Sequence, residues 1–277
     1  MIAFVGSVFS PYYAWSGRQD PENHCAINVA LYGAGSDRWA MTERGRGALR
    51  RTERTFTVGR SALHWSQNGL TIDLNERSVP HLSAIRGTVT LTPDCRPGID
   101  FTLDSAGRHR WWPIAPMAQV SVDLDAPQST WRGHGYFDSN WGSEPLETGF
   151  RRWDWSRFRG RDSALVLYDA ELRGGQDLSM ALRFGADGGL ERLTPPERAD
   201  LPAGLWRVQR GTRVDAGNSV SVSRRLEDSP FYTREILNTR LYGERGPAVH
   251  ESLDLDRFAS PIVKLMLPFR MPRAAFG

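Results

Sequence analysis

Hydrophobic and polar residues alternate in almost every segment of this chain that shows a period. The alternation runs through residues 70–74, 88–92, 120–124, 165–172 and 219–223. A period of two residues is typical of β-strands that bury one face. The 27 glycines and 17 prolines separate these segments at short intervals, as tight turns do in sandwiches and barrels. The pattern predicts an all-β protein.

Helical periodicity is nearly absent. The best helix candidate covers residues 258–267, which follow an acidic stretch and are interrupted by Pro261 and Pro268. A domain boundary is expected at residues 124–127, where an alternating segment ends in a polar stretch that contains proline. This boundary gives domains 1–125 and 126–277, and each has the size of one lipocalin-like barrel.

Composition excludes several classes of function. The net charge is +3 and Lys264 is the single lysine. The sequence also has no basic run interleaved with aromatics that would indicate nucleic-acid binding. Cys25 and Cys95 lack metal-site spacing and are expected to be free thiols. The start of the chain does not resemble a signal peptide, and no segment has the roughly 18 apolar residues of a membrane span. We expect a cytoplasmic or peripheral protein.

Metal and cofactor motifs are also missing. The candidate ligands have no recognised spacing for zinc or calcium; they are His109, His134, Asp138, Asn140 and Glu144. No glycine-rich phosphate loop opens a helix, and no Gly-x-Ser-x-Gly is present. The sequence therefore predicts no metal, no nucleotide cofactor and no serine-hydrolase mechanism.

Residues 131–140 are the first candidate for chemistry. As a strand, this segment places His134, Tyr136 and Asp138 on one face, with Tyr136 and Asp138 about 7 Å apart. Gly133 and Gly135 indicate a bulge or a close approach of another backbone or a ligand. The alternative is an ordinary strand that ends in an Asx turn at residues 138–140. Geometry alone favours the alternative.

Two further aromatic clusters lie outside this segment. The same alternation puts His109 and Trp111 on one strand face after a turn at Gly107, and Trp153 and Trp155 on another. Ten tryptophans are a heavy aromatic content, and large rings gather where apolar surfaces meet. Core packing is the simpler explanation of each cluster taken alone.

Together these segments resemble one family, the carotenoid 1,2-hydratases of purple bacteria, also called hydroxyneurosporene synthases. The resemblance spans essentially the whole chain, with matches at residues 3–13, 39–46, 109–111, 131–142, 153–157, 250–258 and 266–273. It implies two lipocalin-like β-barrel or β-sandwich domains with an apolar pocket near their junction. It also implies that water adds across the terminal 1,2 double bond of an acyclic carotene such as neurosporene or lycopene.

The resemblance also assigns site residues. A His-x-Trp pair and a Tyr-x-Asp pair matter in this family, and they fall here on catalytic positions His109, Trp111, Tyr136 and Asp138. The expected substrate-binding side chains are Trp112, His134, Trp141, Trp153 and Trp155.

Alkene hydration requires an acid, a means of stabilising a tertiary cation, and one positioned water. Asp138 is the natural acid if burial raises its pKa above about 3.9. Trp111 and Tyr136 offer ring faces to the cation. His109 can act as base towards the water, or orient Asp138 or Tyr136 through a hydrogen bond. No cofactor is needed.

Two other functions fit parts of the sequence. A non-catalytic carrier of hydrophobic polyenes would need the pocket but no acid, so an exposed Asp138 with an ordinary pKa would favour it. A glycosidase would need paired carboxyls in an open cleft, such as Asp138 and Glu144.

Carotenes dissolve in membranes, so the enzyme is expected to sit peripherally on the inner photosynthetic membrane. Residues 261–276 mix apolar side chains with three cations, and this segment is expected to form either a membrane-contacting surface or an ordinary terminal strand.

Overall fold

The computed structural model describes residues 1–33 and 37–274, which divide into two compact units. Each unit combines separate stretches of the chain. Unit 1 contains Met1–Pro93, Ala118–Gly135 and Lys264–Gly277, and unit 2 contains Asp94–Met117 and Tyr136–Val263. The boundary expected at residues 124–127 falls inside the second stretch of unit 1.

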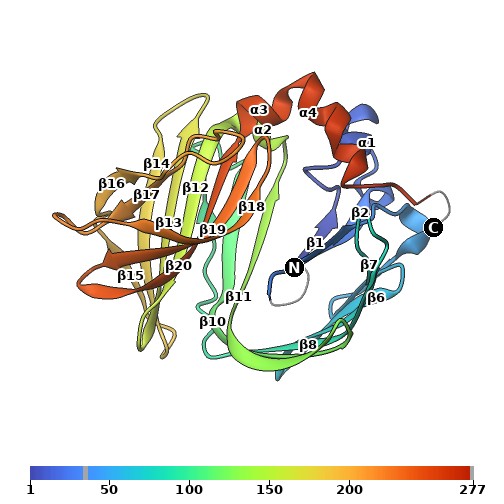
Figure 1. Ribbon diagram of the computed structural model, residues 1–277, viewed down its shortest axis with the longest axis horizontal. Helices are drawn as coiled ribbons and strands as arrows, with labels where there is room; N and C mark the ends of the chain where they lie inside the picture. Colours follow the sequence, from blue (N-terminus) through green and yellow to red (C-terminus); the bar gives the residue numbers. More distant parts are fainter. Residues whose placement is uncertain (34–36, 275–277) are drawn as a thin grey trace. The chain divides into compact units, whose positions relative to one another are not determined.

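Antiparallel strands make up most of the regular structure (Figure 1), which confirms the all-β prediction. A three-stranded sheet has the order β1-β2-β3, and an eight-stranded sheet has the order β11-β10-β8-β7-β6-β5-β4, with β9 paired to β10. The strands are β1 (Ile2–Val5), β2 (Cys25–Leu31), β3 (Arg38–Met41), β4 (Leu49–Arg51), β5 (Thr55–Val58), β6 (Ser61–Ser66), β7 (Gly69–Arg77), β8 (Ala84–Pro93), β9 (Phe101–Thr102), β10 (His109–Ala126) and β11 (Gln128–Gly142).

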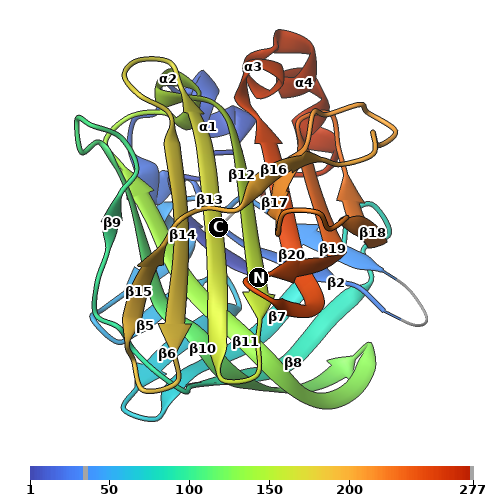
Figure 2. The ribbon, with the colours of Figure 1, turned by 90° about the vertical axis from the view of Figure 1, so that its left-hand side faces the viewer.

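Unit 2 contains a seven-stranded sheet with the order β15-β14-β13-β12-β20-β19-β18. A hairpin of β16 and β17 lies in front of this sheet in Figure 2. The strands are β12 (Phe150–Arg159), β13 (Ser163–Leu172), β14 (Leu178–Gly185), β15 (Leu190–Leu193), β16 (Glu197–Asp200), β17 (Gly211–Val214), β18 (Ser221–Asp228), β19 (Tyr232–Leu241) and β20 (Glu244–Asp254).

The alternating segments of the sequence are strands in the structure. They fall in β7, β8, β10, β13 and β18, except that residues 219 and 220 precede β18. In β7 the side chains of Leu70, Ile72 and Leu74 are buried, whereas Asp73 between them is exposed. One face of the strand therefore packs on the core, as a period of two requires.

The helices are short. The expected helix over residues 258–267 is broken into α3 (Leu255–Ala259) and α4 (Pro261–Met266), followed by a 3-10 turn, η3 (Leu267–Phe269). Asp254 caps α3 by accepting a hydrogen bond from the Arg257 amide, and Pro261 starts a new helix because it cannot continue the first. The others are α1 (Pro11–Trp15), α2 (Leu146–Gly149), η1 (Pro21–Asn23) and η2 (Arg46–Ala48).

None of the helices in the described part of the chain has the length and apolar character needed to cross a membrane.

The long strand β11 settles two expectations about the glycine-rich segment. It continues through Asp138 to Gly142, so the alternative of an Asx turn at residues 138–140 is wrong. The close approach expected at the glycines involves a side chain at Gly135, rather than another backbone or a ligand: a Cβ atom there would lie 2.3 Å from Val120 Cγ2 of β10.

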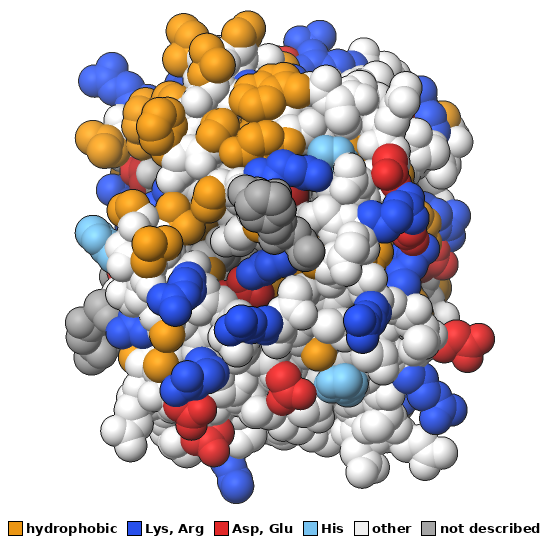
Figure 3. Space-filling model, turned by 90° about the vertical axis from the view of Figure 1, so that its right-hand side faces the viewer, with side chains coloured by type: hydrophobic (Ala, Val, Ile, Leu, Met, Phe, Trp, Pro, Cys, Tyr) orange, Lys and Arg blue, Asp and Glu red, His pale blue; other side chains and the backbone are white. Residues whose placement is uncertain are grey.

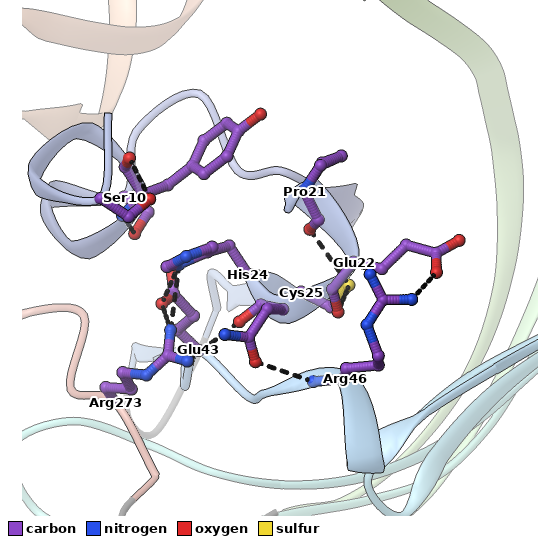
Figure 4. Close-up of polar contacts among 11 residues, drawn as sticks. Ser10, Pro21, Glu22, His24, Cys25, Glu43, Arg46 and Arg273 are labelled. Atoms are coloured by element: carbon purple, nitrogen blue, oxygen red, sulfur yellow. Dashed lines mark hydrogen bonds and ion pairs between the residues drawn. The ribbon is translucent and has the colours of Figure 1, made fainter. Parts of the chain in front are cut away.

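Buried charges hold the last described residues against the rest of unit 1 (Figure 4). The fully buried Glu43 forms an ion pair with Arg273 and lies 2.9 Å from His24 Nδ1. Arg273 also donates to the Asn23 carbonyl at 3.0 Å. Removal of Arg273 would therefore leave the Glu43 carboxylate without its cation. Nearby Cys25 is a free thiol, as is Cys95 in unit 2, which confirms that prediction.

Candidate active site

Asp138 lies on β11 in unit 2 and accepts two hydrogen bonds at the same oxygen. Trp111 Nε1 donates to Asp138 Oδ2 at 2.9 Å, and Tyr136 Oη donates to this atom at 2.9 Å. Tyr136 and Asp138 are two residues apart on one strand and therefore share a face, while Trp111 comes from the neighbouring β10. A neutral Asp138 would carry its proton on Oδ1 and leave Oδ2 as the acceptor.

Burial raises the pKa of Asp138 to about 6, although hydrogen bonds from Trp111 and Tyr136 oppose this rise. The side chain keeps some accessible surface while protein atoms crowd it closely. The same burial, together with the charge of Asp138, raises the pKa of Tyr136 well above its ordinary value. Tyr136 therefore stays protonated and remains a hydrogen-bond donor.

Trp111 is fully buried. Its ring lies between Phe101, at a centroid distance of 5.3 Å, and Tyr168, at 5.6 Å. With no exposed face, the indole cannot offer its ring to a substrate as the sequence suggested. Its observed contribution is the N–H that it donates to Asp138.

Tyr136 joins Asp138 to the seven-stranded sheet. Its ring lies 5.2 Å from that of Trp155 on β12, and both side chains are partly exposed. The guanidinium of Arg157 lies 5.4 Å from the centroid of the Tyr136 ring and donates to the Pro116 carbonyl at 2.9 and 3.1 Å. Burial lowers the pKa of Arg157 to about 10, so it remains a cation at neutral pH.

His109 shares a face of β10 with Trp111, but its imidazole is held elsewhere. Nε2 lies 3.3 Å from Glu144 Oε1, and the ring contacts Phe150 at a centroid distance of 4.7 Å. A Cβ atom at Gly149 would lie 2.8 Å from Nε2, so the ring is closely enclosed. Within the described part of the chain, His109 makes no hydrogen bond to Asp138 or Tyr136.

The expected substrate-binding residues separate into two groups. Trp153 packs near Tyr168 and Phe150, at centroid distances of 6.2 and 5.9 Å, and it shares a face of β12 with Trp155, whose ring contacts Tyr136. The others have exposed side chains and no described contact with Asp138: Trp112, Trp141 and His134. For these three residues, substrate binding stays a prediction.

The sequence did not indicate three neighbours of this site: Tyr168, Arg157 and Phe150. Tyr168 lies opposite Trp155 in the β12–β13 pair, and burial raises its pKa. The signal was present, since Tyr168 is the aromatic residue of an alternating strand, but only the pairing register shows which residue it faces.

No group of three or more His, Cys, Asp or Glu side chains is placed to hold a metal ion among residues 1–33 and 37–274. Glu144, the second carboxylate of the glycosidase interpretation, is engaged by His109 and by Arg108 at 2.9 Å.

Comparison with known proteins identifies relatives of the whole chain. The chain is 54% identical to the acyclic carotenoid 1,2-hydratase of Thiocapsa roseopersicina, over 99% of this chain and 68% of that protein. It is 44% identical to the enzyme of the same name from Cereibacter sphaeroides, over 99% and 98%.

A solved structure shares the fold: a protein described as an AttH from Nitrosomonas europaea, with a TM-score of 0.57 and 16% identity over 83% of this chain and 80% of that one. The family model for the carotenoid hydratase CrtC matches residues 1–276. The chain therefore belongs to the CrtC carotenoid hydratase family.

Proposed function

We propose that this protein adds water, without a cofactor, across the terminal C1=C2 double bond of an acyclic carotene such as neurosporene or lycopene. The product is a tertiary alcohol. The observation that carries this proposal is Asp138, a carboxyl with a raised pKa of about 6 among aromatic rings. Family membership supplies the substrate class.

The first step is proton transfer from Asp138 to C2 of the carotene. Protonation at C2 leaves the positive charge on C1, where three carbon substituents stabilise it. Trp111 and Tyr136 hold the carboxyl through Oδ2, so the proton on Oδ1 is the one available for transfer. An exposed aspartate would be ionised at neutral pH and could not donate.

The second requirement is stabilisation of the tertiary cation. The partly exposed rings of Tyr136 and Trp155 lie next to Asp138, and a desolvated cation over such a face gains about 2 kcal/mol or more. That gain corresponds to more than about tenfold in rate. Water then attacks C1, and loss of one proton from the added oxygen completes the alcohol.

A direct assay tests the function. We expect purified, chelator-treated protein to convert lycopene or neurosporene in detergent micelles to a product heavier by one water, as measured by mass spectrometry. Tight pigment binding without any product would favour the carrier instead. The raised pKa of Asp138 already argues against a carrier, which needs no acid.

We also propose that the protein reaches its substrate through peripheral contact with a membrane. Ile262, Leu265 and Phe269, on α4 and η3, are 71%, 65% and 80% exposed, and Lys264 and Arg270 lie in the same segment. Apolar side chains gather in the upper part of the face in Figure 3, the end where α1 and α4 lie in Figure 1. The helical conformation excludes the terminal strand as an alternative for residues 261–269. Residues 275 and 276 of the expected segment lie outside the described residues.

Substitution tests this contact better than truncation, because truncation would remove Arg273 from the buried Glu43. We expect Leu265→Ser with Phe269→Ser to lower partition into anionic phospholipid vesicles at least about tenfold, since each side chain loses about 1.5–3 kcal/mol of burial. The matched control is Leu205→Ser with Trp206→Ser, which changes two exposed apolar residues of unit 2. Equal co-sedimentation of the two double variants would contradict the proposal.

A further inference from the structure

A row of charged side chains leads to Trp155 across four strands of the seven-stranded sheet. Glu251 on β20 pairs with Trp155, Arg234 on β19 pairs with Glu251, and Glu227 on β18 pairs with Arg234. Directly opposed residues of antiparallel strands point to the same face. Glu251 therefore lies on the face that carries Trp155 and, through its ring contact, Tyr136.

Glu251 has one engaged oxygen and one free oxygen. Oε1 accepts from Arg234 Nε at 2.9 Å, and Oε2 has no hydrogen bond among the described residues. The carboxylate is 25% exposed. Beside it, the indole Nε1 of Trp155 is buried with no hydrogen-bond partner. Since Nε1 has no accessible surface, Oε2 is the atom of this directly paired couple that can still accept from a water molecule.

The charge of Glu251 also acts on the carboxyl of Asp138. Its negative charge is one of the causes that raise the pKa of Asp138, after burial, and it acts on Tyr168 in the same direction. The cation at C1 needs a nearby negative charge, and the attacking water needs a base. His109 does not meet this need, because its Nε2 contacts Glu144 instead.

We propose that Glu251 holds the attacking water through Oε2 and accepts its proton. The inference rests on the proposed hydratase function. As the water oxygen forms its bond to C1, one O–H bond breaks and the proton passes to Glu251. Asp138, which lost its proton to C2, and Glu251, which gained one, return to their starting states by exchange with solvent. Atoms and charge balance, and no other reactant is required.

Glu251→Gln keeps the shape and removes the base. We expect hydration to fall about 10²–10⁴-fold, the usual contribution of a general base, with carotene binding retained. In D2O, Asp138 still transfers a deuteron to C2 and forms the carotene cation. Because water captures this cation slowly in the variant, the cation loses a proton from C2 instead and returns to carotene. Deuterium should therefore appear in the recovered carotene, and the ratio of exchange to hydration should rise at least tenfold.

The pH profile gives a second readout. Removing the charge of Glu251 lowers the pKa of Asp138, so the fall of activity on the alkaline side should move to lower pH. A role confined to packing would not move it. The charged or titratable groups that face Glu251 are Arg234 on β19, Asp138 on β11 and Tyr168 on β13.

Glu227→Gln is the matched control. Glu227 Oε1 lies 3.8 Å from Arg234 Nη1, and the substitution removes the same charge from the side of Arg234 that faces away from Glu251. It should keep the wild-type exchange ratio. Glu251→Asp, which retains a carboxylate, should recover part of the lost activity and covers the case in which the glutamine variant does not fold. Hydration by Glu251→Gln within threefold of wild type, or an unchanged exchange ratio, would overturn the role of Glu251. A wild-type protein that neither hydrates nor exchanges would instead refute the hydratase function itself.

Discussion

Replacing Asp138 by asparagine is expected to abolish hydration while carotene binding stays nearly intact. The amide keeps the size of the side chain and can still accept from Trp111 and Tyr136, but it has no acidic proton. General acids contribute about 10²–10⁴-fold to rate, and protonation of an unactivated alkene depends entirely on the acid. Product formation followed by mass spectrometry, with pigment binding followed by absorbance, measures both effects.

The matched control is Asp154→Asn. Asp154 is also a carboxyl of unit 2 whose pKa burial raises, to about 7, but it alternates with Trp155 on β12 and so faces the opposite side of the sheet. This variant should keep its hydration rate. If Asp138→Asn retained more than a few per cent of activity, or if both variants lost it equally, the proton donor would have to be another group.

The wild-type pH dependence follows from the same carboxyl. Catalysis needs the protonated form, and the pKa of Asp138 is about 6. Activity should therefore fall about tenfold for each unit above this pH. At pH 7 about one molecule in ten carries the acidic proton, which is enough for slow turnover. An ordinary aspartate, with a pKa near 3.9, would leave about one in a thousand.

The strands and the candidate proton donor, Asp138, could be predicted from the sequence for different reasons. Alternation is a local signal, so β7, β8 and β13 could be predicted from a few residues each. Asp138 could not be distinguished from a turn residue by its own neighbours. The chain-long resemblance selected it, and the structure supplies the reason: β11 continues past Asp138, so Tyr136 and Asp138 share a face.

What the sequence missed depends on contacts between distant residues. Glu251 and Trp155 are 96 positions apart in the sequence, and only the β12–β20 register makes them neighbours. A shift of one residue would turn Glu251 to the other face. Likewise, no local pattern encodes the enclosure of Trp111 between Phe101 and Tyr168, which leaves the N–H that it donates to Asp138 as its observed contact with the site.

The opposite face of the same sheet should carry the largest stability effect, at the ion pair between Arg210 and Glu235. Both side chains are fully buried, and Glu235 alternates on β19 with Arg234 of the charged row. Arg210→Met is expected to lower the free energy of unfolding by about 3 kcal/mol, because it removes the buried cation of Glu235 and leaves only the partly exposed Arg225, whose Nε lies 3.4 Å from Oε1. Denaturant unfolding measures the loss.

A double variant identifies the cause. Arg210 Nε and Nη2 and Glu235 Oε2 have no hydrogen-bond partners, so the pair itself is poorly compensated for its lost hydration. Replacing both residues, as Arg210→Met with Glu235→Leu, should therefore recover most of the stability that either single change loses. The control is Arg183→Met, which breaks an exposed pair with Glu191 and should cost about 1 kcal/mol or less.

One face of the sheet is then expected to contribute to hydration and the other to stability, and one set of variants can test both. The Arg210 and Glu235 variants should hydrate carotene at the wild-type rate at temperatures where they stay folded, because Asp138, Trp155 and Glu251 lie on the other side of the sheet. If the double variant lost as much free energy of unfolding as the two single variants together, the two charges would act independently. Loss of hydration in a folded Arg210 variant would mean that the faces are coupled, for example through His250, which pairs with Glu235 and whose pKa burial and the charge of Arg210 lower to about 3.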